Sequence, residues 1–179
     1  MQQPSTSPVF EFDAIGTRWW CETLDASMIS DDLQRKTLQL CDEFNRAYSR
    51  FRDDSLIGQL NTNKVLPHPP QELCDMFVLC HELYIVSDGV FNISIGGVLH
   101  AQGYGSRKFG AAAQPDFWQH TAVSAAEIRI PQNATVDIDG IGKGWLIDKI
   151  VALFHTHGLH EFIVNGGGDM FIAAKNPVE

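Results

Sequence analysis

Polar and apolar residues alternate along residues 9–24, which read VFEFDAIGTRWWCETL. A period of two with many aromatic and β-branched residues is typical of strands that bury one face. Two short strands joined as a hairpin around Ile15-Gly16-Thr17 are therefore predicted. Residues 1–8 are polar and rich in Pro, Ser and Thr, so we expect them to form a flexible arm.

Two segments carry apolar residues at helical spacing. Residues 30–48 open with Ser30 and Asp31, either of which can cap a helix. Residues 69–87 open with Pro, and Gly89 follows just past their end. Both segments are predicted to be amphipathic helices that pack on the core.

The C-terminal part of the chain mixes strand and helix patterns. Residues 100–127 lack a clear period and predict a loop region with at most one short helix. After them, the pattern predicts strands at 127–130, 135–139, 161–165 and 170–175, a helix at 143–157, and glycine turns near 140–142 and 166–168. Without a parallel βαβ series, this order indicates an α+β fold with helices packed on a largely antiparallel sheet. We expect residues 9–179 to form a single domain.

The charge balance narrows the choice of ligands. Among 179 residues there are 13 Lys and Arg against 22 Asp and Glu, a formal net charge of -9, and no block of basic residues occurs. Binding to nucleic acid through a broad basic surface is therefore disfavoured. An anionic ligand must instead be held locally, by backbone N–H groups, a helix N-terminus or a metal ion.

Neither a membrane span nor a signal peptide is indicated. The sequence has no apolar run of about 18 residues, and its N-terminus lacks the basic and apolar regions of a leader, so a cytoplasmic location is expected. The four cysteines fall in apolar segments without C-x-x-C pairing. They predict buried thiols rather than a disulfide or a zinc site.

Two glycine-rich segments are candidates for ligand binding. In residues 136–148, VDIDGIGKGWLID, a glycine turn between a strand and a helix could cradle a phosphate on free N–H groups, or could merely connect the two elements. In residues 165–169, NGGGD, the glycines indicate either a close approach by a ligand or another backbone, or a plain hairpin turn. The two turns follow successive strands and could lie at one edge of the sheet. Residues 87–94 favour a helix C-cap that enters a strand.

Six segments match known motifs in order. Ile15-Gly16-Thr17 matches Met-Gly-Thr, residues 49–55 with Asn61 match Ser-Thr-Tyr-Arg-x-Asp-Ser…Asn, and residues 88–94 match Asp-Gly-Ala-Phe-Asp-x-Thr. Residues 103–105 match part of Trp-Gly-Phe-Gly, residues 137–148 match Asp-Leu-Gly-Gly-Ile-Ala-Lys-Gly-Tyr…Asp, and residues 166–169 match Gly-Gly-Gly-Asp. Together they resemble the ApbE-like FAD:protein FMN transferases, a bacterial family that moves FMN from FAD onto a Thr of a target protein.

The resemblance implies a flavin-transferase-like fold and a site for FAD, the substrate, and Mg²⁺. Ile15 and Phe51 would flank the isoalloxazine ring, Lys143 would lie near the pyrophosphate, and the Gly142 carbonyl would be a magnesium ligand. The other cofactor-binding positions that the motifs imply are Gly16, Thr17, Ser55, Val90, Phe91, Asn92, Asp139, Trp145 and Asp169. The implied reaction joins FMN to an acceptor Thr of a target flavoprotein through a phosphoester bond.

Several departures from the family pattern keep alternatives open. Ile15 replaces a Met, Phe51 a Tyr and Asn92 an Asp, so a sulfur contact, a hydroxyl and a charge are lost. Family members continue through a second half, so we expect this chain to be truncated at its C-terminus, with the catalytic base beyond Glu179. A non-catalytic FAD- or FMN-binding module, or an inactive fragment lacking the catalytic half, is the alternative. Family members are often exported lipoproteins, which contrasts with the location expected above.

Overall fold

A computed structural model describes residues 8–25, 27–102 and 116–175. The chain divides into two compact units: unit 1 comprises Met1–Asn45 and Gly142–Glu179, and unit 2 comprises Arg46–Ile141. The division falls inside two helices, α1 (Asp31–Tyr48) and α5 (Asp139–Thr156). The prediction that residues 9–179 form one domain stays a prediction.

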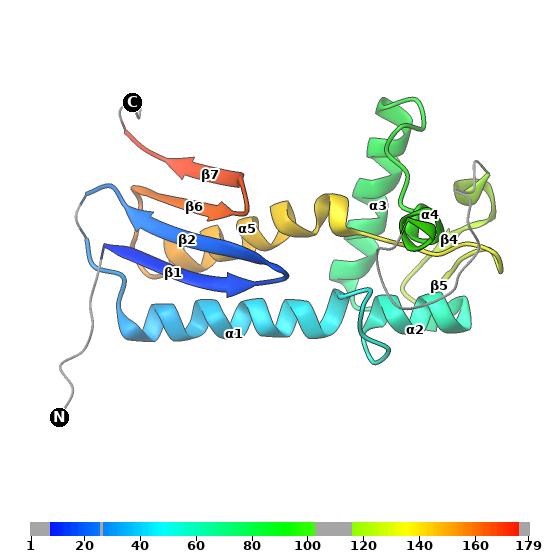
Figure 1. Ribbon diagram of the computed structural model, residues 1–179, viewed down its shortest axis with the longest axis horizontal. Helices are drawn as coiled ribbons and strands as arrows, with labels where there is room; N and C mark the ends of the chain where they lie inside the picture. The colour runs from blue at the N-terminus through cyan, green and yellow to red at the C-terminus, as the bar shows by residue number, and fades with distance from the viewer. Residues whose placement is uncertain (1–7, 26, 103–115, 176–179) are drawn as a thin grey trace. The chain divides into compact units, whose positions relative to one another are not determined.

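Unit 1 contains a four-stranded antiparallel sheet in the order β1-β2-β6-β7 (Figure 1). Its strands are β1 (Val9–Ala14), β2 (Thr17–Thr23), β6 (Phe162–Gly166) and β7 (Asp169–Ala173). The predicted first hairpin is confirmed: Ala14 pairs with Thr17, and the two loop residues, Ile15 and Gly16, have φ values of 41° and 79°. Positive φ at both loop positions is the type I′ geometry, whose twist matches that of the flanking strands.

One face of this sheet forms the core of unit 1 with helices α1 and α5. The sheet contributes Trp19, Cys21 and Val164, which lie on adjacent strands and are fully buried. The helices contribute Leu33 of α1 and Phe154 of α5, whose exposed fractions are 2% or less. The Phe154 and Phe162 rings lie 5.2 Å apart. Helix α1 starts where the sequence predicts, because Ser30 Oγ accepts the N–H of Leu33 at 3.3 Å.

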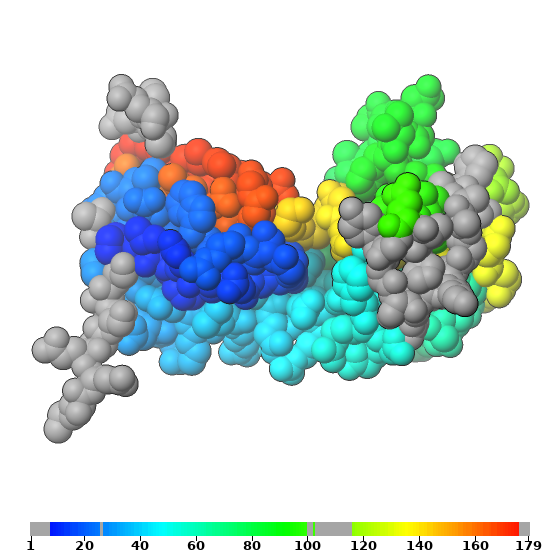
Figure 2. Space-filling view, in the orientation of Figure 1, coloured from blue at the N-terminus to red at the C-terminus, as the bar shows by residue number. Residues whose placement is uncertain are grey.

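The other face of the sheet is open where β7 lies at the edge. Met170 and Ile172 point away from the core and are exposed, and Figure 2 shows the atoms of β7 (red) on the visible surface of unit 1. The predicted glycine turn between β6 and β7 is a hairpin turn, with φ values of 67° at Gly167 and 104° at Gly168.

Unit 2 is helical, with a small antiparallel sheet in the order β3-β5-β4. Its elements besides the ends of α1 and α5 are α2 (Leu56–Asn63), β3 (Val65–Pro67), α3 (Gln71–Val86), α4 (Gly96–Ala101), the 3₁₀ helix η1 (Phe117–His120), β4 (Ala122–Val123) and β5 (Glu127–Arg129). Helix α3 confirms the predicted second helix. It ends as expected, because Gly89 has a φ of 80° and donates its N–H to Tyr84 O at 2.9 Å.

Three predicted features are wrong: two strands, and a glycine turn with the helix start that follows it. Residues 135–139 form no strand: Thr135 makes a single bridge to Ile95, and the N–H of Asp137 bonds Ile93 O at 2.8 Å. The predicted turn at 140–142 and the start of the next helix are also displaced, because α5 already begins at Asp139. The carboxylate of Asp137 accepts the N–H of Asp139 at 2.7 Å and so starts the helix before the glycines. The strand expected after residues 87–94 is likewise not formed, and only their helix-end turn is present.

The predicted α+β class, with helices on a largely antiparallel sheet, is confirmed, since all pairings between named strands are antiparallel. None of the helices in the described ranges is long and apolar enough to cross a membrane. Residues 1–7 of the predicted arm and the motif at 103–105 lie outside the described residues.

The four cysteines are free and buried, as predicted. Burial raises the pKa values of the Cys21, Cys41 and Cys80 thiols to about 12. Because the thiolate is the reactive form, we expect the native thiols to react with a disulfide reagent at pH 8 at least about a hundredfold more slowly than those of the denatured chain. Absorbance of the released thiol measures both rates, and rapid labelling of two or more cysteines in the native protein would contradict the burial.

Candidate functional site

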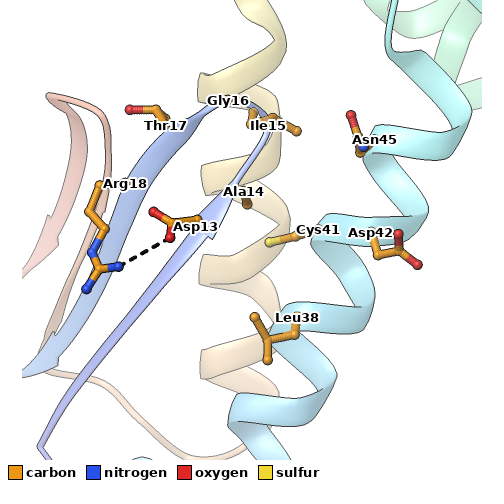
Figure 3. A pocket seen from close by; sticks show the side chains of 10 residues that line it. All are labelled: Asp13, Ala14, Ile15, Gly16, Thr17, Arg18, Leu38, Cys41, Asp42 and Asn45. Carbon is orange, nitrogen blue, oxygen red and sulfur yellow. Dashed lines mark hydrogen bonds and ion pairs between the residues drawn. The ribbon is translucent and has the colours of Figure 1, made fainter.

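The tip of the first hairpin borders a cavity of about 610 Å³ in unit 1 (Figure 3). Three of the predicted flavin contacts, Ile15, Gly16 and Thr17, line it, and the opposite wall is α1 with Leu38, Cys41, Asp42 and Asn45. Figure 3 shows Cys41 pointing from α1 toward the hairpin near Ala14. Polar and apolar residues are about equally common in the lining of the cavity, and its volume lies within the range of small-molecule sites.

A second contact joins this hairpin to the β6–β7 turn. A Cβ atom at Gly167 would lie 2.5 Å from Thr17 Oγ1, and the Gly167 N–H donates to Arg18 O at 3.1 Å. A Cβ atom at Gly166 would lie 2.6 Å from the Trp19 ring. The glycines at 166 and 167 therefore permit both a tight turn and a close approach of strand β2, which were the two interpretations left open by the sequence.

Lys143, another predicted residue, lies beside the strand that follows the β6–β7 turn in unit 1. Its Nζ lies 3.1 Å from Asp169 Oδ2, and both side chains are substantially exposed. This ion pair places Lys143 of α5 beside Asp169 at the start of β7. Trp145, two residues further along α5, is half-buried.

The start of α5 offers less to an anion than the sequence predicts. The N–H of Asp139 already donates to the Asp137 carboxylate, and the N–H of Ile141 donates to Ile138 O at 3.0 Å. Asp139 also places a negative charge in the first turn. A phosphate would therefore find its cation at Lys143 rather than a row of free N–H groups at the helix end.

In unit 2, four residues form a compact charged and aromatic cluster, which we call the Arg50 cluster: Arg50, Phe51, Asp137 and Asp139. Arg50 Nε lies 2.8 Å from Asp137 Oδ2 and 3.1 Å from Asp139 Oδ2. Its guanidinium carbon lies 4.2 Å from the centroid of the Phe51 ring. The sequence assigned Phe51 and Asp139 to the site but missed Arg50 and Asp137, although both stand inside the matched motifs.

Asp137 is the least satisfied charge of this cluster. The Asp137 side chain is 2% exposed, and Arg50 Nε lies at ion-pair distance from it. The Nε–H of Arg50, however, donates to Asp139. Asp137 Oδ2 therefore receives no hydrogen bond from the described residues. Burial raises the pKa of the Asp137 carboxyl, and the charge of Asp139 adds to this, while the Asp139 N–H and Arg50 oppose it. Such a partly satisfied buried carboxylate is characteristic of binding sites.

Ser55 has a structural explanation in unit 2. It is buried and caps α2 by accepting the Gly58 N–H at 2.9 Å, and its hydroxyl donates to Ser49 O at 2.6 Å. A Cβ atom at Gly58 would clash with the backbone oxygen of Arg52, so the loop is wound tightly against the helix. These contacts fix the loop that presents Arg50 and Phe51.

The predicted site residues in the segment after α3 differ in their exposure to solvent. Val90 is exposed, whereas Phe91 and Asn92 are half-buried. A Cβ atom at Gly140 would lie 3.0 Å from the Phe91 ring, so Phe91 adjoins the start of α5 as Arg50 does. Asn92 Oδ1 accepts the N–H of Ser94 at 2.9 Å, which holds the turn. The predicted site residues thus form two groups, one in each unit.

No group of three or more His, Cys, Asp or Glu side chains among the described residues could hold a metal ion. Gly142, the predicted magnesium ligand, is buried within α5, where a backbone carbonyl accepts the N–H four residues on. The described residues therefore offer magnesium at most this carbonyl, and a complete site is not formed by them.

Comparison with solved structures shows a shared fold. The flavin transferase ApbE from Vibrio cholerae matches with a TM-score of 0.76 at 18% identity, over 97% of this chain and 61% of that one. The apo form of the flavinyl transferase ApbE from Pseudomonas stutzeri gives 0.77 at 17% identity, over 99% and 64%. The ApbE protein from Thermotoga maritima gives 0.75 at 14% identity, over 97% and 60%. The chain thus spans about three fifths of the length of these structures.

The sequence places the chain in a family. The model of the ApbE family matches residues 15–178, nearly the whole chain. The chain belongs to the ApbE family, and the resemblance drawn from its motifs is confirmed. No curated protein sequence matches it.

Proposed function

We propose that this protein takes part in flavin transfer, moving FMN from FAD onto a Thr of a target flavoprotein in a magnesium-dependent reaction. The observation that carries the proposal is the meeting of three predicted segments in unit 1. Thr17 of the hairpin adjoins Gly167 of the β6–β7 turn, which lies more than a hundred residues further along the chain, and Lys143 of α5 forms an ion pair with Asp169 at the end of the same turn. Family membership and the shared fold with proteins described as flavin transferases support the same assignment.

In the proposed reaction, the oxygen of the acceptor Thr attacks the phosphorus of the FMN half of FAD. The bond between this phosphorus and the bridging oxygen breaks, AMP leaves with that oxygen, and the hydroxyl proton passes to a base. The described residues supply no assigned base. Lys143 would act by neutralising the pyrophosphate, since its exposed ammonium can exchange Asp169 for a phosphate oxygen.

Magnesium would lower the charge on the pyrophosphate. Mg²⁺ commonly combines one or two protein oxygens with substrate phosphates and water, so the Gly142 carbonyl would supply one ligand and the phosphates and water the others. The proposed role of Lys143 does not depend on the metal.

The test is an assay with FAD, a target flavoprotein domain that contains the acceptor Thr, and Mg²⁺ or EDTA. Transfer is read as a flavin-fluorescent band of the target after denaturing electrophoresis, together with AMP release. Replacing the acceptor Thr by Val in the target is the control, because it removes the attacking hydroxyl. Labelling that needs Mg²⁺ and this Thr supports the proposal.

Two other results would change the assignment. Binding of FAD without labelling of the target would favour a non-catalytic flavin-binding module. The observation behind this alternative is that the chain covers only about three fifths of the length of the flavin transferase structures. If FAD neither bound to the chain nor labelled the target, the flavin assignment would be wrong.

A further inference from the structure

Arg50 and Phe51 form a stacked pair at the surface of unit 2. The guanidinium carbon lies 4.2 Å from the centroid of the Phe51 ring. The Arg50 side chain is 12% exposed, whereas Phe51 is 62% exposed. One face of the ring is therefore covered by a cation while much of the remaining ring is open to solvent.

Two carboxylates hold the guanidinium in this position. Arg50 Nε is 2.8 Å from buried Asp137 and 3.1 Å from Asp139. Asp137 in turn accepts the Asp139 N–H at 2.7 Å. A planar guanidinium that is held by carboxylates in this way stacks on an aromatic ring with little further loss of freedom.

The charge of the Arg50 cluster indicates what kind of ligand can lie on the ring. One cation faces two carboxylates, so the cluster does not attract a phosphate to Phe51. A planar, uncharged heteroaromatic ring suits the exposed face, because aromatic rings stack in offset geometry without needing a charge.

We infer that Arg50 is a positioning residue, which fixes the Phe51 ring as a stacking platform for the uncharged ring of a flavin. The inference rests on the proposed function, since it takes the flavin as the planar ligand. Arg50 itself does not touch the flavin: it acts through Phe51. A ring that is already fixed loses less conformational freedom when a ligand stacks on it, which strengthens binding.

The experiment is a titration of the full chain with riboflavin, which carries the ring but no phosphate. The visible difference spectrum of the bound flavin reports stacking, and its concentration dependence gives the affinity. The variants are Arg50→Lys, Phe51→Leu and the double variant. Arg50→Lys keeps a cation beside buried Asp137, so unit 2 stays folded, but it loses the flat guanidinium face. Arg129→Met is the matched control, since Arg129 pairs only at the surface with Glu127 at 2.9 Å in the same unit.

We expect Arg50→Lys to weaken riboflavin binding about two- to fivefold and to reduce the difference spectrum. Phe51→Leu should weaken binding more, and the double variant should match Phe51→Leu alone, because Arg50 acts only through the ring. Arg129→Met should match the wild type. Thermal melting confirms that each variant is folded.

Three results would overturn the inference: unchanged affinity in Arg50→Lys, an equal loss from this substitution with and without Phe51, or no riboflavin spectrum in the wild type. The transfer assay distinguishes a failure of this inference about Arg50 from a failure of the proposed function. Riboflavin stacking without FMN transfer would remove the transferase assignment and retain the stacking platform. FMN transfer together with normal riboflavin binding by Arg50→Lys would retain the transferase assignment and remove the positioning role of Arg50.

Discussion

Asn61→Ala is expected to lower the free energy of unfolding by about 2–6 kcal/mol, since it leaves two buried backbone groups without partners, at about 1–3 kcal/mol each. Asn61 Nδ2 donates to Val136 O at 2.8 Å, and Asn61 Oδ1 accepts the Val136 N–H at 2.7 Å. Asn61 is 3% exposed and Val136 fully buried, so water does not replace these bonds in the folded chain. Urea unfolding followed by circular dichroism measures the effect.

Asn61→Asp and Asn63→Asp make a matched pair for this prediction. In Asn61→Asp a carboxylate oxygen faces Val136 O, and a charge is buried, so we expect a loss at least as large as that from Ala. Asn63 lies on the same helix but is exposed, and its replacement by Asp should cost only a few tenths of a kcal/mol. A change below about 1 kcal/mol in Asn61→Ala would show that the segment at Val136 does not depend on this clamp.

The same contact explains why one predicted strand fails. Residues 135–139 have the alternation of a strand, but their backbone is bonded by the Asn61 side chain and by Ile93 O, which lie 75 and about 44 residues away. A local pattern cannot reveal partners that are so distant in the sequence. The hairpin at Ile15-Gly16 was predictable, in contrast, because its two alternating strands and Gly16 are close together in the sequence, although Ile15 is an unusual residue at a positive φ.

The site was predictable from the motifs only in part. The motifs named Lys143 and Asp169, and the structure joins them at 3.1 Å. Arg50 and Asp137 were missed, because a residue that orients another gives no signal until the contact is seen. The available sign for Asp137 was an acidic residue between the apolar residues Val136 and Ile138, since a buried carboxylate without a partner is costly.

Lys143→Ala is expected to slow FMN transfer by about a hundredfold or more, since removal of one preorganised charge beside a developing anion costs about 2–4 kcal/mol of transition-state stabilisation. Stability should hardly change. The Lys143–Asp169 pair is exposed on both sides, and such pairs contribute about 0–1 kcal/mol. The transfer assay gives the rate, and thermal melting gives the stability.

Ligand binding separates this role from a structural one without relying on turnover. FAD carries a pyrophosphate and riboflavin carries none, so Lys143→Ala should weaken FAD binding and leave riboflavin binding as it is. Lys149→Ala, on the same helix but lining a separate groove with Lys36 and Leu153, is the matched control and should alter neither affinity. If Lys143→Ala weakened both ligands equally, the lysine would support the ring site through the fold. If it weakened neither, the ion pair with Asp169 would be its only contribution, and the pyrophosphate would have to be bound elsewhere in the protein.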